Sequence, residues 1–323
     1  AIFAAISGSS VATAVTIGAM AIPEMLKRGY DRRLVVGSVA AGGTLGILIP
    51  PSIPMILYGT ITDESVGKLF MSGVVPGALL TLAFVAYIVF ASWNKPREER
   101  ASHEAKMKSL RENIWGLLLP VIIIGGIYTG VFTPTEAAAV GTVYALIITF
   151  FIYHSITIED MPAILRATIK TSCMIFAIMV GAMLFGYILT VLQVPQALMS
   201  LVTDGHLNKW IVLIGINIVL LILGCVLETV SIILITLPML YPIIKALGFD
   251  PIWFNVVLLI NMELALITPP VGMNLFVIKG ISEDSSIQDI IVGAAPFAVI
   301  MVLEIALLCF VPGIATWLPS VLK

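Results

Sequence analysis

Residues 42–52 read Gly-Gly-Thr-Leu-Gly-Ile-Leu-Ile-Pro-Pro-Ser, in the middle of an apolar run that extends from residue 34 to residue 58. A run of this length can cross a bilayer as a helix, but its glycines and two adjacent prolines oppose an unbroken one. Pro51 has no backbone N–H and pushes Pro50 out of the α region, so nearby carbonyl groups lose their donors. Polar backbone at that depth is tolerated only when it is buried in protein or faces a watery cavity. The sequence therefore predicts two half-helices that meet at a site.

The same pattern occurs a second time in the apolar run 252–278, where residues 267–274 read Ile-Thr-Pro-Pro-Val-Gly-Met-Asn. Each break follows a short polar cluster at nearly the same distance. The clusters are Ser-Gly-Ser-Ser at 7–10 and Glu-Thr-Val-Ser at 228–231; Ser9 lies 41 residues before Pro50, and Thr229 lies 40 before Pro269. Two copies of one pattern indicate an internal repeat. Paired, Pro- and Gly-interrupted segments in corresponding halves point to the binding site of a secondary transporter.

The composition is that of an integral membrane protein. Of 323 residues, 59% are hydrophobic and 11% are charged, and the mean hydropathy is +1.10. Soluble domains carry about 25% charged residues. The apolar runs are continuous and about 20 residues long, which favours helical spans over β-barrel strands. The fold class predicted is therefore an all-α polytopic membrane protein.

Several functional classes find no support in the sequence. The net charge of −2 gives no basic field for nucleic acid. There is neither a P-loop nor an H-E-x-x-H motif. The three cysteines stand singly in apolar stretches, and the histidines lie in expected loops. We therefore expect no enzyme, no cofactor and no metal other than a coupling ion.

The polar clusters are expected at the tips of two re-entrant helical hairpins. Only 12 apolar residues follow the first cluster (11–22) and 13 follow the second (232–244), whereas a full crossing needs about 17 to 25. The expected topology places 13 basic residues on one side of the membrane and 4 on the other, which makes the first side cytoplasmic. The first hairpin then opens to the cytoplasm and the second to the exterior, as in an inverted repeat. The C-terminus is expected on the external side.

Three regions follow from this pattern. Residues 1–93 form the C-terminal part of the first repeat, 94–113 an amphipathic cytoplasmic connector, and 114–323 the second repeat, with spans expected at 69–93, 114–129, 137–153, 172–192 and 290–317 and a loop at 195–209. The chain begins inside an apolar run without methionine, so we expect that the first hairpin lacks its leading arm.

The broken helices and hairpin tips offer helix N-termini, which suit a carboxylate, and carbonyl and hydroxyl oxygens, which suit Na⁺. One predicted cation site comprises Ser7, Ser9, Ser10, Gly43 and Pro51, and the other comprises Gly224, Thr229, Ser231, Thr268 and Met273. The alternative is that these small residues only allow close helix packing. Glu228 and Glu263 lie within apolar runs, where an ionisable residue suggests function, although Glu263 can equally pair within the bundle. Asn261 and Asn274 could serve substrate or packing.

Four motifs then resemble the large membrane subunit of tripartite ATP-independent periplasmic (TRAP) transporters. They are Ser-Gly-Ser-Ser-Val-Ala-Thr at 7–13, Gly-Thr-Leu-Gly-Ile-Leu-Ile-Pro-Pro-Ser at 43–52, Phe-Thr-Pro-Thr-Glu-Ala-Ala-Ala at 132–139 and Thr-Pro-Pro-Val-Gly at 268–272. The motifs occur in the family's order along the whole chain. Members of the family carry additional N-terminal residues, including the first hairpin arm.

The resemblance implies a Na⁺-driven, elevator-type transporter of the bacterial inner membrane that imports an organic acid, such as a C4-dicarboxylate or sialic acid. A periplasmic binding protein would deliver the substrate, and a small membrane subunit, separate or fused, would complete the scaffold. The resemblance maps the two predicted cation sites to the two hairpin tips, with the substrate carboxylate between them. The expected substrate-binding residues are Ser52, Glu228, Pro270 and Asn274.

Two other interpretations stay open. A stand-alone Na⁺/dicarboxylate symporter shares the double hairpin and needs no binding protein, but it is expected to carry Ser-Asn-Thr at both tips. A membrane assembly subunit that does not transport, or an intramembrane hydrolase, belongs to a different class.

Overall fold

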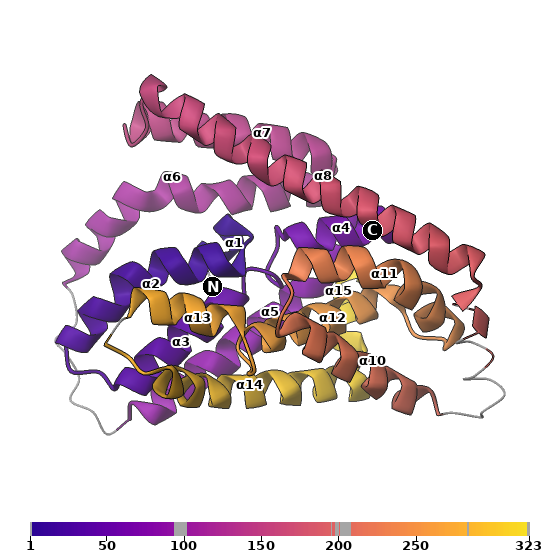
Figure 1. Cartoon of the computed structure of the whole chain (residues 1–323). Coiled ribbons are helices and arrows are strands. Elements are labelled where there is room, and N and C mark those ends of the chain that lie inside the picture. The colour runs from indigo at the N-terminus through magenta and orange to yellow at the C-terminus, as the bar shows by residue number, and fades with distance from the viewer. Residues whose placement is uncertain are drawn as a thin grey trace.

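The structure, a computed structural model, describes residues 2–93, 102–194, 196, 197, 200, 208–282 and 284–321. Within these ranges the chain is helical and contains no strand (Figure 1). Six of the described helices are long and apolar enough to cross a membrane. The all-α polytopic fold is therefore confirmed.

Two parts of the chain have the same order of elements. Each part contains a helix, a tip, a second helix, a broken helix and a span. In the first part these are α1 (Ile2–Ser7), α2 (Ser10–Lys27), α3 (Arg32–Thr44), α4 (Ile53–Thr62) and α5 (Val66–Ala91); in the second they are α10 (Lys209–Gly224), α11 (Thr229–Ala246), α12 (Pro251–Leu266), α13 (Met273–Ile281) and α14 (Ile287–Phe310). A final helix, α15 (Gly313–Val321), packs against α5.

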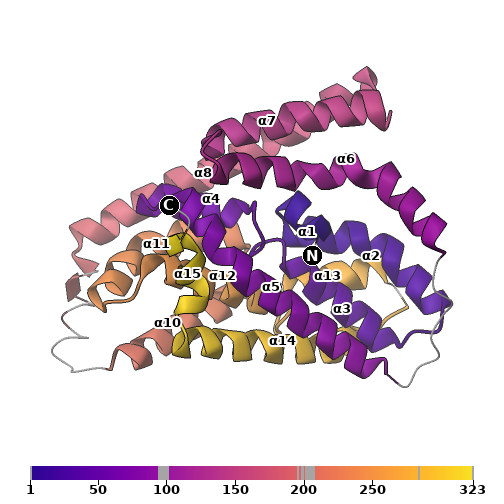
Figure 2. The ribbon, with the colours of Figure 1, turned by 180° about the vertical axis from the view of Figure 1, so that it is seen from behind.

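The contacts between the two parts are reciprocal. Helix α2 packs against α13, and its counterpart α11 packs against α4. Likewise α3 packs against α14, and α12 packs against α5 (Figure 2). Exchanging the two parts leaves this set of contacts unchanged, as a two-fold relation between them requires. The repeat is thus present in three dimensions, while its inverted orientation in the bilayer stays a prediction.

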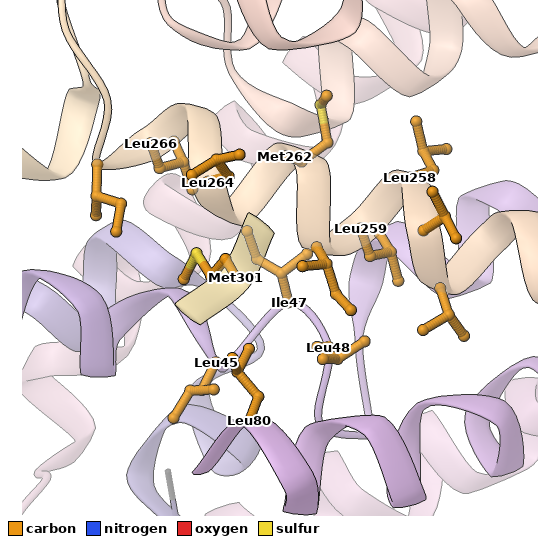
Figure 3. Packing of buried hydrophobic residues seen from close by; sticks show 14 of the residues in the cluster. Leu45, Ile47, Leu48, Leu80, Leu258, Leu259, Met262, Leu264, Leu266 and Met301 are labelled. Atoms are coloured by element: carbon orange, nitrogen blue, oxygen red, sulfur yellow. The ribbon is translucent and has the colours of Figure 1, made fainter. Parts of the chain in front are cut away.

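Helix α12 lies at the centre of the molecule. Every residue from Trp253 to Leu266 is buried. Figure 3 shows Leu259 of α12 directed toward Ile47 and Leu48 of the first break, with Met301 of α14 beside Ile47. Since lipid tails are as apolar as these side chains, close packing rather than transfer from water stabilises this core.

A second layer lies along one side of the repeats, at the top of Figure 1. It consists of α6 (His103–Tyr128), α7 (Pro134–Ile147) with its π-helical extension η1 (Ile148–Ile152), the short η2 (Ile158–Asp160) and α8 (Met161–Val191). Helix α8 packs against α11, and α6 packs against α1. The layer therefore touches both hairpins.

The motif at 132–139 begins this layer's second helix. Thr133 is the N-cap of α7 and forms a reciprocal capping box with Glu136, followed by Pro134 in the first turn. The Phe132 ring lies over Gly126 of α6, where an added Cβ would come within 2.1 Å of it. The motif therefore fixes the tight turn between α6 and α7 through capping and ring packing.

The predicted lengths of the hairpin arms were wrong. Helices α2 and α11 each contain 18 residues, not 12 and 13. Helix α2 includes Ser10 at its start and continues through the polar residues Glu24 and Lys27, and α11 includes Thr229 at its start and Lys245 in its last turn. Helix α11 is long and apolar enough to cross a membrane. Arm length therefore does not argue for re-entrance, and the depth of the tips in the bilayer stays a prediction.

Other boundaries also differ. The expected connector and span meet within one helix, because α6 continues across residue 113, while residues 94–101 lie outside the described ranges. Helix α8 begins at Met161, well before residue 172. The last span, expected to reach residue 317, ends at Phe310, since Pro312 cannot continue the helix; α15 follows it. Most of the predicted loop 195–209 is not described.

Helices α3 and α14 cross so closely at Gly37 that one added methyl group should destabilise the fold. A Cβ at Gly37 would lie 2.1 Å from the Gly293 carbonyl group. We expect Gly37→Ala to lower the free energy of unfolding by about 1–3 kcal/mol through overpacking, measured as thermal stability in detergent. Gly42→Ala on the same helix meets no atom within 4 Å and is the control. Equal stability of the two variants would contradict the observed crossing.

Candidate functional site

The first hairpin tip is held by its own hydroxyl groups. Ser9 is the N-cap of α2 and accepts a hydrogen bond from the Ala12 N–H at 3.4 Å. Ser7 Oγ donates to the Ser9 carbonyl at 3.0 Å and lies 2.6 Å from Thr13 Oγ1. Gly8 has a φ of +60° and would place a Cβ 3.4 Å from the Pro51 carbonyl oxygen. The tip therefore lies against the first break.

The second tip contacts the second break in a corresponding way. The Gly272 N–H donates to the Cys225 carbonyl at 3.2 Å, and Cys225 Sγ lies 3.6 Å from the Pro269 carbonyl. Gly224 would place a Cβ 2.5 Å from Ala265 Cβ, so α10 meets α12 closely beside this tip. Each hairpin tip thus rests on the broken helix of its own half.

Both long apolar runs are broken at their Pro–Pro pairs, as predicted. Helix α3 ends at Thr44, and α4 begins after Ser52, whose hydroxyl donates to the Ile47 carbonyl. Helix α12 ends at Leu266, and α13 begins after Gly272, which has a φ of +62°. Both Pro–Pro peptide bonds are cis. The first break is largely buried, whereas Pro269, Pro270 and Val271 of the second break are exposed.

A cavity of about 200 Å³ lies where the two tips meet. The first tip contributes Ser9 and Ser10, and the second contributes Glu228 and Thr229. The remaining walls come from the starts of α4 and α13, from Ile47 and Leu266 beside the breaks, and from α8. The expectation that residues 7–10 and 228–231 lie side by side is therefore confirmed.

The cavity brings together only some of the predicted site residues. Its lining includes Ser9, Ser10, Glu228, Thr229 and Met273, and does not include Ser7, Gly43, Pro51, Gly224, Ser231, Thr268, Ser52, Pro270 or Asn274. Most of the second group lie in the tips and breaks directly behind the lining residues. Ser52 is fully buried, whereas Pro270 is exposed. Their roles as ligands stay predictions.

Packing explains three of these residues without a ligand. Gly43 would place a Cβ 3.0 Å from Ala14 Cβ, so it allows α3 to lie directly on α2. Gly224 has the corresponding place between α10 and α12. Asn274 donates to Ser10 Oγ at 2.7 Å and to the Ala40 carbonyl at 3.1 Å, which links α13 to the first hairpin and to α3.

The sequence gave no indication of one wall of the cavity. Thr171, Met174 and Ile175 of α8 line it, although α8 lies outside the repeat. Helix α8 is largely apolar with three scattered threonines, and it carries no motif that distinguishes it from an ordinary span. Only the packing of α8 against α11 brings these residues to the tips.

The electrostatics of the cavity come from helix ends and one carboxylate. The N-termini of α2, α4, α11 and α13 all lie at or beside the cavity, and each carries roughly half a positive charge. Glu228, the N-cap of α11, is the only ionisable side chain among the lining residues, and none of them is basic. The cavity can therefore hold an anion and a cation together better than an anion alone.

Several buried polar atoms lie outside this cavity. Among the described residues, the side-chain atoms without a hydrogen-bond partner are Tyr128 Oη, both polar atoms of Asn255, Asn261 Oδ1, Asn274 Oδ1 and all four carboxyl oxygens of Glu263 and Glu304. Glu263 and Glu304 do not line the cavity between the tips. Within the described ranges, no group of three or more His, Cys, Asp or Glu side chains could hold a metal ion.

Comparison with known proteins decides the family. Residues 1–314 match the model of the tripartite ATP-independent periplasmic transporter, DctM component. The chain belongs to this TRAP large permease family. Large permeases of this family are subunits of organic-acid importers, working with a small membrane subunit and a periplasmic binding protein.

Curated relatives cover nearly the whole of this permease. The C4-dicarboxylate TRAP transporter large permease protein of Pseudomonas aeruginosa is 44% identical over 99% of this chain and 75% of its own length. The corresponding protein of Rhodobacter capsulatus is 40% identical over 100% of this chain and 77% of its own. The sialic acid TRAP transporter large permease protein of Vibrio cholerae is 34% identical over 99% of this chain and 75% of its own length.

The link made by Asn274 can be tested by a side-chain truncation. We expect Asn274→Ala to lower the free energy of unfolding by about 1–3 kcal/mol, because the buried Ser10 hydroxyl and Ala40 carbonyl lose their donor. The measurement is thermal stability of the purified permease. Asn113→Ala removes an exposed amide bonded to the Ser109 carbonyl and should have little effect. An equally small effect at Asn274 would show that the link does not stabilise the fold.

Proposed function

We propose that this permease imports a C4-dicarboxylate together with Na⁺ across the bacterial inner membrane, with its C-terminus on the periplasmic side. Relatives from Pseudomonas aeruginosa, Rhodobacter capsulatus and Vibrio cholerae at 44%, 40% and 39% identity are named C4-dicarboxylate permeases. A sialic acid permease at 34% identity supports a carboxylate as the shared chemical feature. The observation that carries the proposal is the cavity between the two tips, with four helix N-termini at its walls.

Under this proposal, the substrate carboxylate lies between the tips and accepts hydrogen bonds from backbone N–H groups at the helix N-termini. Glu228 lines the same space and would repel a carboxylate. Bound Na⁺ offsets this repulsion, so the acid binds well only after the cation. The absence of any basic side chain among the lining residues supports this order, since no other positive side chain is at hand.

The proposed cation sites lie on the two sides of the cavity, and each includes residues that line it. The first combines Ser7, Ser9, Ser10, Gly43 and Pro51, at the contact between the first tip and the first break. The second combines Gly224, Thr229, Thr268 and Met273, at the contact between the second tip and the second break. Neutral carbonyl and hydroxyl oxygens are available in both places, and these are hard ligands suited to Na⁺.

We further propose that the two repeats move as one body against the layer formed by α6, α7 and α8, as in an elevator transporter. The reciprocal contacts between the repeats support a single body. The layer touches this body through the hairpin helices α1 and α11. A periplasmic binding protein would deliver the substrate, and the small membrane subunit would complete the scaffold.

Reconstitution in liposomes tests the proposal. The permease with its small membrane subunit should take up labelled succinate only when both an inward Na⁺ gradient and the loaded binding protein are present. Sialic acid in excess should compete poorly. Uptake without the binding protein would instead indicate a stand-alone symporter, and uptake without Na⁺ would exclude the proposed coupling.

The cation sites predict two sensitive hydroxyl groups. Ser9→Ala and Thr268→Ala should each raise the Na⁺ concentration for half-maximal uptake, because each removes a proposed oxygen ligand. Ser65→Ala removes an exposed N-cap on α5, and Thr60→Ala removes a hydroxyl that bonds the i−4 carbonyl as Thr268 does; both are controls. Unchanged Na⁺ activation in both site variants would remove the assignment.

A further inference from the structure

A second, larger hollow lies away from the tips, between α10, α12 and α14. It has a volume of about 740 Å³ and is partly open to the surface. Its walls are almost wholly apolar, with Leu213 and Ile218 from α10 and Val302 and Ile305 from α14. None of its lining residues lines the cavity between the tips, so the groove is a separate feature.

The polar groups on the groove's floor are turned toward one another. Asn261 Nδ2 donates to the Asn217 carbonyl at 2.8 Å and to Asn217 Oδ1 at 2.7 Å. Asn217 Nδ2 donates to the Leu213 carbonyl at 2.8 Å. The Asn261 amide group therefore joins α12 to α10, and the Asn217 amide group bonds within α10. Apart from these two side chains, the lining residues are almost all apolar. The groove suits a hydrocarbon chain.

The mouth of the groove is basic and aromatic. Trp210 lines the groove at the start of α10. The centres of the Trp210 and Phe249 rings lie 5.3 Å apart. Lys209 Nζ lies 5.7 Å from the centre of the Trp210 ring and 5.3 Å from that of Phe249. No described carboxylate forms a salt bridge with Lys209. Tryptophan and lysine at one level are typical of the headgroup region of a bilayer.

The length of the groove matches one leaflet of a bilayer. Along α10 it extends from Trp210 to Leu221, a rise of about 16 Å at about 1.5 Å per residue. Half of a hydrocarbon core of about 30 Å is about 15 Å. An acyl chain entering at Trp210 would therefore end close to Leu221 and Leu264, about one helical turn before the end of α10 at Gly224.

We propose that this groove binds one phospholipid, with an acyl chain between α10 and α14 and the headgroup phosphate at Lys209. The lipid completes the packing behind the arm of the second hairpin. It is a fixed component of the permease, unlike the lipids that exchange freely around the other helices. Its contact with α10 supports the arm that leads to Gly224 and the second tip.

Filling the groove tests the acyl-chain site. Ala306→Trp on α14 places a large ring inside the groove, whereas Val299→Trp adds the same ring to an exposed position of α14 outside it. Native mass spectrometry of the permease purified in detergent should show one retained phospholipid in the unaltered protein and in Val299→Trp, and its loss in Ala306→Trp. Retention of the lipid by a monodisperse Ala306→Trp variant would overturn the proposal.

The headgroup contact is tested at the mouth. Lys209→Gln should weaken binding of added phosphatidylglycerol about fivefold, as expected for loss of one lysine beside a phosphate, and leave diacylglycerol binding unchanged. Lys245→Gln removes a lysine with a similar aromatic contact at Tyr241, outside the groove, and is the control. Equal losses in both variants would rule out a specific phosphate contact.

A third measurement uses the fluorescence of Trp210 at the mouth of the groove. Phosphatidylglycerol brominated in mid-chain, added at one molecule per permease, should quench tryptophan fluorescence in the unaltered protein and less in Trp210→Phe. Trp93→Phe, which removes an exposed tryptophan of another region, should keep the quenching. A groove occupied by a protein helix instead of a lipid would give no saturable quenching at Trp210, and this result would refute the proposal.

Discussion

The constraint on which the structure depends is the backbone left without helical hydrogen bonds at two Pro–Pro breaks. Lipid offers no donor or acceptor, so this backbone must be buried in protein or face a water-filled cavity. Each break is contacted by the hairpin tip of its own half, through the Gly272 N–H bond to Cys225 in the second half and the approach of Gly8 to Pro51 in the first. The breaks and tips are thus parts of one feature that occurs twice.

Neither half could bury its own elements alone. The second half of each broken helix packs against a hairpin helix of the other repeat, and α12 is buried from Trp253 to Leu266 among elements of both. Glycines at Gly37, Gly43, Gly224 and Gly293 allow the backbones to approach where these helices cross. Close packing of this kind replaces the hydrophobic driving force that lipid does not supply. The cavity between the tips is lined by residues of both repeats.

The same arrangement links cation and acid binding under the proposed function. Helix N-termini give the cavity partial positive charge, and Glu228 gives it a full negative one. The carboxylate of Glu228 would repel an acid that binds alone, whereas bound Na⁺ would offset this repulsion. Behind the second tip, the groove between α10 and α14 lies beside the arm that carries Gly224. A lipid in that groove would therefore contact the arm of the second hairpin and would not contact the cavity between the tips.

The sequence by itself determined the fold class, the internal repeat, both helix breaks and the two tips, because proline, glycine and serine act on the local backbone wherever they occur. It predicted Ser9, Ser10, Glu228, Thr229 and Met273, which share one cavity. It could not give the ends of α2 and α11, since polar residues are tolerated in terminal turns. Only the tertiary structure decided that Asn274 bonds to Ser10 and that Thr171 of α8 lines the cavity, because these contacts join residues distant in sequence and leave no local pattern.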